Sequence, residues 1–245
     1  MFRRGLRPMR FAIAIAALLP GLPARAQAPD APADQPAAAE SGAVYKPPLR
    51  GAPGGRVGGA SRGAVASAVP LPTIELIAPL DHTGETASAT PVLYFYVSQA
   101  VALPMQLTIS QPLVAKPLLE ATFASPPARG LYALRLADYH VQLQPGIAYT
   151  WSVSAIVDRK NWSRNVVASA TVERVTPEPS LSSALNTASP VRRVVLLAGA
   201  GLWYDAVAAA AEAENLDRHA ALDGLLEQVG LRDVAAADRA APVAH

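Results

Sequence analysis

Apolar and polar residues alternate with a period of two through the middle of the chain, from about residue 72 to residue 176. In the clearest run, Leu103–Ile109, every second side chain is apolar. This alternation is typical of strands with one buried face. Three further runs share the same period: Leu93–Val97, Leu119–Phe123 and Ile147–Val153. We therefore expect about seven short strands and a mainly β domain over residues 72–176.

The segment around Tyr149 refines this prediction. Tyr149 follows the turn Gln144–Gly146 and opens a strong strand, which is where a tyrosine corner is found. In that motif the tyrosine hydroxyl bonds to the backbone a few residues upstream, while the ring fills one end of a sandwich. An ordinary core tyrosine fits the pattern equally well. In both cases the segment resembles immunoglobulin or fibronectin type III modules, so we expect an antiparallel β-sandwich of that kind.

Helical periodicity replaces the alternation near Ser189. Ser189 fits an N-cap with Pro190 at the first helical position, and apolar residues recur at helical spacing from Val191. The run Gly201–Ala206 resembles part of a tetratricopeptide unit. A single unit cannot hide its apolar face, because such arrays need about three repeats. We therefore expect a helical appendage over residues 190–233 that docks on the sandwich or on another molecule.

Residues 1–26 have the pattern of a secretory signal peptide. Basic residues precede the apolar run Phe11–Leu19, and small residues follow it up to Ala26. A membrane anchor needs about 18 apolar residues, whereas this run stops at Pro20. Arg3 and Arg4 also resemble part of a twin-arginine signal, which leaves the export route open. We expect a periplasmic or extracellular protein.

Residues 27–71 contain few large apolar side chains, so they cannot bury enough surface to offset the entropy of ordering. We predict a Pro/Gly-rich linker there, although its basic Gly motif is less random than its surroundings. Arg50, Arg56 and Arg62 in this motif are candidate partner-binding residues, either ordered by a partner or laid along a sheet edge. The remaining predicted boundaries are a linker over residues 177–189 and a disordered tail over residues 234–245.

Charge and cysteine content exclude several function classes. The whole chain has a formal net charge of +2, but residues 1–26 hold five of its 21 basic residues and none of its 19 acidic ones. The mature chain is therefore mildly acidic, and nucleic-acid binding is not expected. The chain has no cysteine, which excludes disulfides, thiolate catalysis and cysteine-ligated zinc. The four histidines show no metal-ligand spacing, so no metal, cofactor or catalytic residue is predicted.

Asp81 and His82 are the adjacent pair whose side chains best fit acid–base chemistry, since a carboxylate beside an imidazole can orient a general base. Adjacent side chains on an extended chain point to opposite faces, so the pair alone is not expected to form a dyad. We predict a turn in which Asp81 accepts backbone N–H groups and Gly84 takes a positive φ. The motif Gly59–Gly63 matches G-x-S-x-G around Ser61 but lacks the strand and helix of a nucleophile elbow.

Four blocks of sequence, taken in order, resemble one bacterial family, domain of unknown function 928. The blocks are Lys46–Gly63, Ile77–Tyr96, Pro145–Val153 and Ala200–Ala206. The chain has Ala60 and Ser61 within the Gly-rich block and Phe95 within the aromatic block, where the family usually has other residues. The resemblance implies an exported bacterial protein and adds no mechanism.

These patterns favour an exported, non-enzymatic protein-interaction module of the cell envelope. Its partner would be another envelope protein or a second copy, contacted through the apolar helical face or the basic arm, with no nucleic acid and no membrane span in the mature chain. Asp81, His82, Trp203 and Tyr204 are further partner-binding candidates, although aromatic residues in a helical turn are more often core. Two alternatives stay open. One is a hydrolase or carbohydrate-active enzyme using Asp81, His82 or Ser61. The other is a sugar- or peptide-binding module using the residues Tyr94, Tyr96 and Tyr132.

Overall fold

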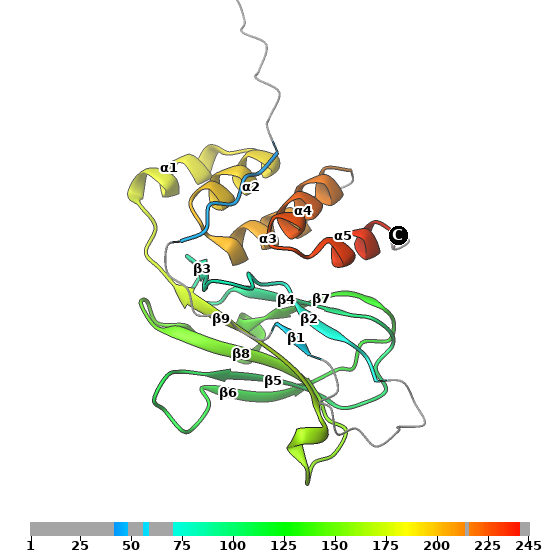
Figure 1. Ribbon diagram of the computed structural model, residues 1–245. Coiled ribbons are helices and arrows are strands. Elements are labelled where there is room, and N and C mark those ends of the chain that lie inside the picture. Colours follow the sequence, from blue (N-terminus) through cyan, green and yellow to red (C-terminus); the bar gives the residue numbers. More distant parts are fainter. Residues whose placement is uncertain (1–41, 49–55, 59–70, 214–215, 241–245) are drawn as a thin grey trace, which may run out of the picture. The chain divides into compact units, whose positions relative to one another are not determined.

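The computed structural model describes residues 42–48, 56–58, 71–213 and 216–240. Within these ranges the chain forms nine strands and five α-helices, with the helices following the strands in sequence (Figure 1). The elements in chain order are β1 (Val57–Gly58), β2 (Ile74–Leu76), β3 (Gly84–Thr86), β4 (Val92–Val97), β5 (Met105–Ser110), β6 (Leu119–Phe123), β7 (Gly130–Arg135), β8 (Ala148–Ala155), β9 (Val166–Arg174), α1 (Pro179–Thr187), α2 (Pro190–Gly199), α3 (Trp203–Glu212), α4 (Leu216–Gln228) and α5 (Arg232–Arg239).

The strands form two sheets, one of four strands in the order β1-β2-β4-β7 and one of five in the order β3-β9-β8-β5-β6. Every pairing within the sheets is antiparallel except that of β3 with β9, which is parallel. The prediction of a purely antiparallel arrangement is therefore wrong at this edge. The reason lies in the connection, because the chain leaves the four-stranded sheet after β2 and enters the other sheet beside β9.

The alternation read from the sequence defines the buried face of each sheet. Met105, Leu107 and Ile109 on β5 have no exposed surface, and the alternate residues of β8 from Tyr149 to Val153 are equally buried. Phe95 on β4 meets Phe123 on β6 edge to face, with ring centroids 5.6 Å apart. The two sheets therefore share one apolar core, as the period-two runs predicted.

Tyr149 also makes the contact expected of a tyrosine corner. Its ring is buried, and its hydroxyl oxygen accepts a hydrogen bond from the backbone N–H of Gln144 at 3.3 Å. Gly146, in the turn between them, has a φ of 74°, a conformation that glycine adopts without strain. This turn fixes where β8 begins.

The helix signals near Ser189 are confirmed. The Ser189 side chain accepts a hydrogen bond from the N–H of Arg192, and Pro190 is the first residue of α2. Gly201 separates α2 from α3 with a φ of 79°. A Cβ at Gly201 would lie 2.9 Å from the carbonyl oxygen of Lys46, so glycine is also required by close packing.

The helices dock on the sheets of their own chain. α3 packs against β3 and β4, and its residues belong to the same buried cluster as those of both sheets. They are therefore part of the core rather than an appendage, and the apolar helical face proposed for a partner is covered. No helix of the described ranges has the length and apolar content needed to cross a membrane.

Two helices lie where the sequence predicted none. α1 falls inside the predicted linker 177–189 and starts at Pro179, but none of its side chains is buried. α5 falls largely inside the predicted tail 234–245, and it buries Val234, Ala235 and Ala237. Both are short, and α5 consists mainly of alanine and charged residues, so neither presents a wide apolar stripe in the sequence.

Parts of the predicted linker 27–71 are ordered by tertiary contacts. The N–H of Lys46 donates to the carbonyl oxygen of Ala198 on α2, and β1 pairs with β2 at the sheet edge. Gly58 is essential to this placement, since a Cβ there would lie 2.5 Å from the backbone of Val167 on β9. Of the basic motif, the described residues Arg56–Gly58 lie at a sheet edge, as one of the two interpretations predicted, but the edge belongs to their own chain. Arg50 and Arg62 lie outside the described residues.

Candidate functional site

The candidate residues Asp81, His82 and Trp203 meet Tyr45 where the helices join the sheets; we call these four residues the Tyr45 cluster. The Oδ1 atom of Asp81 lies 2.7 Å from Nδ1 of His82, and the Tyr45 hydroxyl lies 2.8 Å from Nε2 of the same ring. The Tyr45 ring stacks on His82 with centroids 5.5 Å apart and meets Trp203 edge to face at 4.9 Å. These contacts join the N-terminal segment, the β2–β3 connection and α3.

Asp81 and His82 therefore do form a hydrogen-bonded pair, and the expectation that they would not is wrong. The expectation assumed an extended backbone, whereas residues 80–82 lie in a bend, which brings adjacent side chains to the same side. The Asp81 side chain is 88% exposed and that of His82 is 11% exposed. The hydrogen bond with His82 is the main cause that lowers the pKa of Asp81.

Both nitrogens of the His82 ring are engaged. A carboxylate only accepts hydrogen bonds, so Nδ1 carries the proton shared with Asp81, and in the neutral ring Nε2 accepts from Tyr45. Burial raises the pKa of Tyr45, which keeps its hydroxyl a donor. The arrangement resembles an oriented base, but the nitrogen that a substrate would use already faces a buried tyrosine.

Gly84 is needed for close packing and not for a positive φ, which corrects the second part of the turn prediction. It is the first residue of β3, and it is absent from the described residues with φ in the left-handed region. A Cβ at Gly84 would lie 2.7 Å from Cε2 of Tyr204. The glycine therefore lets α3 approach the sheet edge.

Arg56 is buried, with 5% of its surface exposed, and its guanidinium holds three backbone carbonyls. Nη1 donates to Ala78 and Val229 at 3.1 and 2.7 Å, and Nη2 donates to Gly230 at 3.1 Å. Nε lies 3.7 Å from the carboxylate of Glu75. Arg56 thus ties β1 to the end of α4 and to the β2–β3 connection, so its described contacts are internal to the chain.

Trp203 and Tyr204 are core residues, and this decides between the two interpretations of the aromatic pair. The indole Nε1 of Trp203 donates to the carbonyl oxygen of Ile77 at 3.0 Å. The Tyr204 hydroxyl accepts from Nε1 of Trp151 and donates to the carbonyl oxygen of Thr171, each at 2.9 Å. Both side chains are 2% exposed or less, so the proposed exposed docking role for them is wrong.

The remaining predicted candidates divide into two groups. Arg50, Ser61 and Arg62 lie outside the described residues. Of the aromatic residues considered for sugar or peptide binding, Tyr94 is buried, while Tyr96 and Tyr132 are partly buried. The Tyr132 hydroxyl donates to the carbonyl oxygen of Ala128 at 2.8 Å, and its ring lies 5.8 Å from that of Phe95. The described contacts of Tyr132 thus serve the fold.

Large apolar side chains are exposed on two loops at opposite ends of the five-stranded sheet. The β5–β6 loop, residues 111–118, exposes Leu113, Val114 and Leu118, and Leu113 has a φ of 63°. This loop leads into β6, which is the last strand of its sheet and whose outer edge pairs with no strand of the described residues. The β8–β9 loop, residues 156–165, exposes Trp162.

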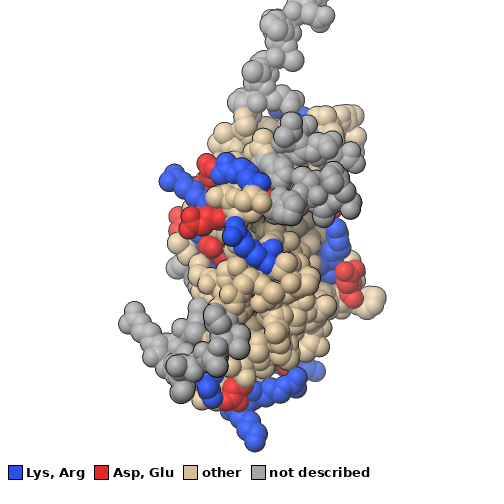
Figure 2. Space-filling view, turned by 90° about the vertical axis from the view of Figure 1, so that its right-hand side faces the viewer, with Lys and Arg blue, Asp and Glu red and all other residues tan. Residues whose placement is uncertain are grey.

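Basic residues accompany Trp162. Arg159, Lys160 and Arg164 are exposed in the same loop, where Asp158 is the one acidic residue. Figure 2 shows Lys and Arg side chains gathered at the bottom of the view, where the β8–β9 loop lies in Figure 1. Trp162 was not among the predicted partner-binding residues, although an isolated tryptophan among basic residues was a usable signal.

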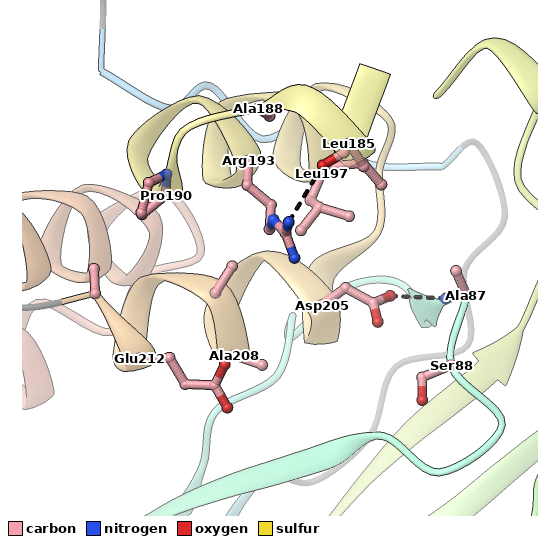
Figure 3. A pocket seen from close by; sticks show the side chains of 12 residues that line it. Ala87, Ser88, Leu185, Ala188, Pro190, Arg193, Leu197, Asp205, Ala208 and Glu212 are labelled. Atoms are coloured by element: carbon pink, nitrogen blue, oxygen red, sulfur yellow. Dashed lines mark hydrogen bonds between the residues drawn. The ribbon is translucent and has the colours of Figure 1, made fainter. Parts of the chain in front are cut away.

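A pocket of about 610 Å³ opens between α1, α2, α3 and the chain that follows β3 (Figure 3). Two charged side chains that line it, Asp205 and Arg193, form hydrogen bonds to the backbone around it. Asp205 accepts from the N–H of Ala87 at 2.7 Å, and Nη2 of Arg193 donates to the carbonyl oxygen of Leu185 at 3.2 Å. Burial is the main cause that raises the pKa of Asp205. In the described part of the chain, no three histidine, cysteine, aspartate or glutamate side chains stand close enough to hold a metal ion.

Comparisons with known proteins identify a family but no activity. A search of curated proteins found no match. The crystal structure of an engineered protein is similar to part of the chain, with 14% sequence identity over 46% of this chain and a TM-score of 0.30. The similar region covers 22% of that protein's length, and so low a score supports no conclusion. The family model described as Domain of Unknown Function (DUF928) matches residues 57–239, which include both sheets and all five helices, and the chain belongs to this family.

Proposed function

We propose that the protein is an exported, non-enzymatic interaction module of the cell envelope that pairs with a second copy through β6. The observation that carries this proposal is the free β6 edge beside the exposed β5–β6 loop. An unpaired edge strand offers a row of backbone donors and acceptors to another strand. Export is supported by the signal-like pattern of residues 1–26.

The sequence of β6 is complementary to itself in an antiparallel pair. If the two-fold axis passes through Ala121, Leu119 of one copy faces Phe123 of the other, and Glu120 faces Thr122. The first pairing is apolar and the second places a carboxylate beside a hydroxyl, so no like charges oppose each other. β6 also lacks the proline and lysine that commonly protect exposed edges.

The β5–β6 loop adds to this edge. Leu113 is fully exposed and adopts a positive φ, which is unusual for a leucine. Val114 and Leu118 are exposed on the same loop, so apolar surface adjoins the strand that would be paired. Contact with a second copy would remove some of this surface from water, which favours association.

The finer fold assignments belong to the same proposal. The Tyr149 contact with Gln144 supports an immunoglobulin-like sandwich. The placement of Gly201 before α3 supports a tetratricopeptide-like origin for the α2–α3 hairpin. Both assignments favour a binding scaffold, because such modules present loops and edges on a rigid core.

An acid–base enzyme is the second candidate, and the Asp81–His82 hydrogen bond favours it. Such a pair supplies an oriented base when the second ring nitrogen faces substrate. In this chain the second nitrogen faces the Tyr45 hydroxyl, which is itself packed against Trp203. The pair therefore supports the junction between the helices and the sheets better than it supports a reaction.

Charge changes at Thr122 test the proposed pairing. Thr122→Glu would place two carboxylates opposite each other twice in the dimer, whereas Thr122→Lys would place an ammonium opposite each Glu120. We expect the first variant to weaken self-association and the second to strengthen it, by about tenfold each in the dissociation constant. Sedimentation equilibrium at low salt measures both constants against the wild type.

Thr122 is exposed, so neither variant should unfold the chain, and matched thermal melting curves would verify this. Exposed Thr150 on β8 offers a control position within the same sheet, where the same two substitutions should leave association unchanged. A wild type that stays monomeric at all concentrations would overturn the proposal. The proposal would also be overturned if Thr122→Glu and Thr122→Lys changed the dissociation constant in the same direction and by the same factor.

A further inference from the structure

The β8–β9 loop is held in one conformation by its own polar groups. Oδ1 of Asn165 accepts from the N–H groups of Val157 and Asp158 at 2.9 and 3.0 Å. Oδ1 of Asp158 accepts from the N–H groups of Lys160 and Asn161 at 2.8 and 3.2 Å. A loop ordered in this way loses little conformational entropy when it binds.

This loop exposes Trp162, whose surface is 59% accessible to solvent. The other two tryptophans of the chain, Trp151 and Trp203, are fully buried and bonded through their indole nitrogens. Two tryptophans are therefore core residues, while the third is exposed to solvent on a short 3-10 turn, Trp162–Arg164. A large aromatic side chain held outward by a rigid loop is typical of a contact residue.

Three cations belong to this loop. Arg159, Lys160 and Arg164 are all exposed. Asp158, paired with Arg164 at 3.3 Å, is the one acidic residue of the loop.

We propose that the Trp162 loop surface, consisting of the exposed residues of the β8–β9 loop, docks on an anionic phospholipid surface. Tryptophan is enriched at the boundary between lipid and water, where its ring is partly apolar and its N–H is solvated. Clustered Lys and Arg side chains are attracted to anionic headgroups. The proposal goes beyond self-association, because this loop and β6 are different surfaces.

A lipid surface fits this loop better than a protein partner does. A stable protein interface buries roughly 800 Å² on each side, which one short loop cannot supply. Binding to a bilayer requires only one inserted aromatic side chain and several cations facing the headgroups. The mature chain is mildly acidic, so the attraction would be local to this end and would orient the protein on the membrane.

Vesicle binding by the whole mature chain tests the proposal. The probe is vesicles of phosphatidylglycerol mixed with phosphatidylcholine, compared with vesicles of phosphatidylcholine alone. We expect co-sedimentation with the anionic vesicles only, weakened by salt, and a blue shift of tryptophan emission. The buried Trp151 and Trp203 should not respond, so Trp162→Phe should abolish the shift.

Replacing both Arg159 and Lys160 with glutamine should weaken binding to the anionic vesicles by about fivefold for each charge removed. Arg192→Gln on α2 is the matched control, since Arg192 is exposed but belongs to another surface, and it should leave binding unchanged. Arg164 is left intact because it pairs with Asp158. The association variant Thr122→Glu should still bind vesicles, which separates a failure of this proposal from a failure of the pairing at β6.

Three results would overturn the proposal. The first is equal binding to both kinds of vesicle. The second is full binding by the Arg159→Gln/Lys160→Gln variant or loss of binding by the Arg192→Gln control. The third is an emission shift produced by inorganic phosphate or by an acidic polymer such as polyglutamate, with none produced by vesicles, because it would show recognition of an anion without a bilayer.

Discussion

At the scale of single residues, several polar side chains of this chain connect elements distant in sequence. Arg56 is the clearest case, because one side chain holds carbonyls of Ala78, Val229 and Gly230. A buried guanidinium is costly unless it is hydrogen-bonded and paired. The three carbonyls accept from its Nη groups, and the carboxylate of Glu75, 3.7 Å from Nε, supplies the opposite charge, although Nε itself has no hydrogen-bond acceptor among the described residues. The residue was predicted to bind a partner, and the sequence alone could not show that its acceptors lay some 20 and 170 residues away.

We predict that Arg56→Met lowers the free energy of unfolding by roughly 3 kcal/mol, because it leaves buried carbonyls without donors and Glu75 without its cation. Arg56→Lys should recover part of the loss, since an ammonium donates but cannot span three carbonyls as a planar fork does. Urea titrations of the two variants, with exposed Arg192→Met as the control, provide the measurement. A loss no greater than that of the control would contradict the structural role of Arg56.

Asp205 gives the chain a specific dependence on pH. Its folded-state pKa is raised, mainly by burial, above the unfolded value of about 3.9. A carboxyl group that binds its proton more tightly in the folded state contributes stability at low pH, and this contribution is lost as the pH rises from about 4 through the raised pKa. The N–H of Ala87 partly offsets the cost of the charged form.

Asp205→Asn should remove this pH dependence while keeping an oxygen that accepts from Ala87. We therefore expect the variant to gain stability relative to wild type as the pH rises from about 4 to 7. Urea midpoints at several pH values in that window test the prediction. A wild type and variant whose difference is constant with pH would show that Asp205 does not titrate as argued.

At the scale of elements, the period-two and helical patterns predicted most strands and the helices α2, α3 and α4, because a buried face gives a local apolar pattern in the sequence. β1 and α1 were missed for a common reason. Neither has a local apolar pattern, and β1 is placed by Gly58 lying against β9 and by pairing with β2. Such contacts depend on where distant segments lie, which a local pattern cannot encode.

Two glycine substitutions separate close packing from conformational freedom. Gly58→Ala would place a Cβ 2.5 Å from the backbone of Val167, so we expect a loss of about 2 kcal/mol or more as β1 is displaced. Gly224 lies within α4 with open space around its Cα, so Gly224→Ala should stabilise the chain by about 0.5 to 1 kcal/mol. Thermal denaturation of both variants is sufficient, and effects of the same sign would refute the packing argument.

At the scale of the whole molecule, the helices and sheets form one unit through the N-terminal residues of α3. Trp203 bonds to the connection after β2, and Tyr204 bonds to both β8 and β9. The sequence indicated correctly that the helices carry more apolar surface than they hide among themselves. It did not indicate which surface would cover them, and so the helical face was wrongly predicted to bind a partner.

The candidate contact surfaces follow from what this internal docking leaves uncovered. The sheets cover the aromatic residues of α3, and the Tyr45 cluster joins the helices to the sheets. Two exposed features of the described residues are the β6 edge with its loop and the Trp162 loop surface, which lie at different places on the five-stranded sheet. Recognition by exposed edges and loops on a rigid core is therefore the function that we propose.

Hydrogen exchange at β6 is the most direct measurement of this account. The backbone amides of Leu119–Phe123 that face away from β5 should exchange more slowly as the protein concentration rises, because a second copy would then accept their hydrogen bonds. The slowing should be stronger in Thr122→Lys and weaker in Thr122→Glu. Exchange at β6 that is independent of concentration, or slowing confined to α1 and the pocket beside it, would contradict the account.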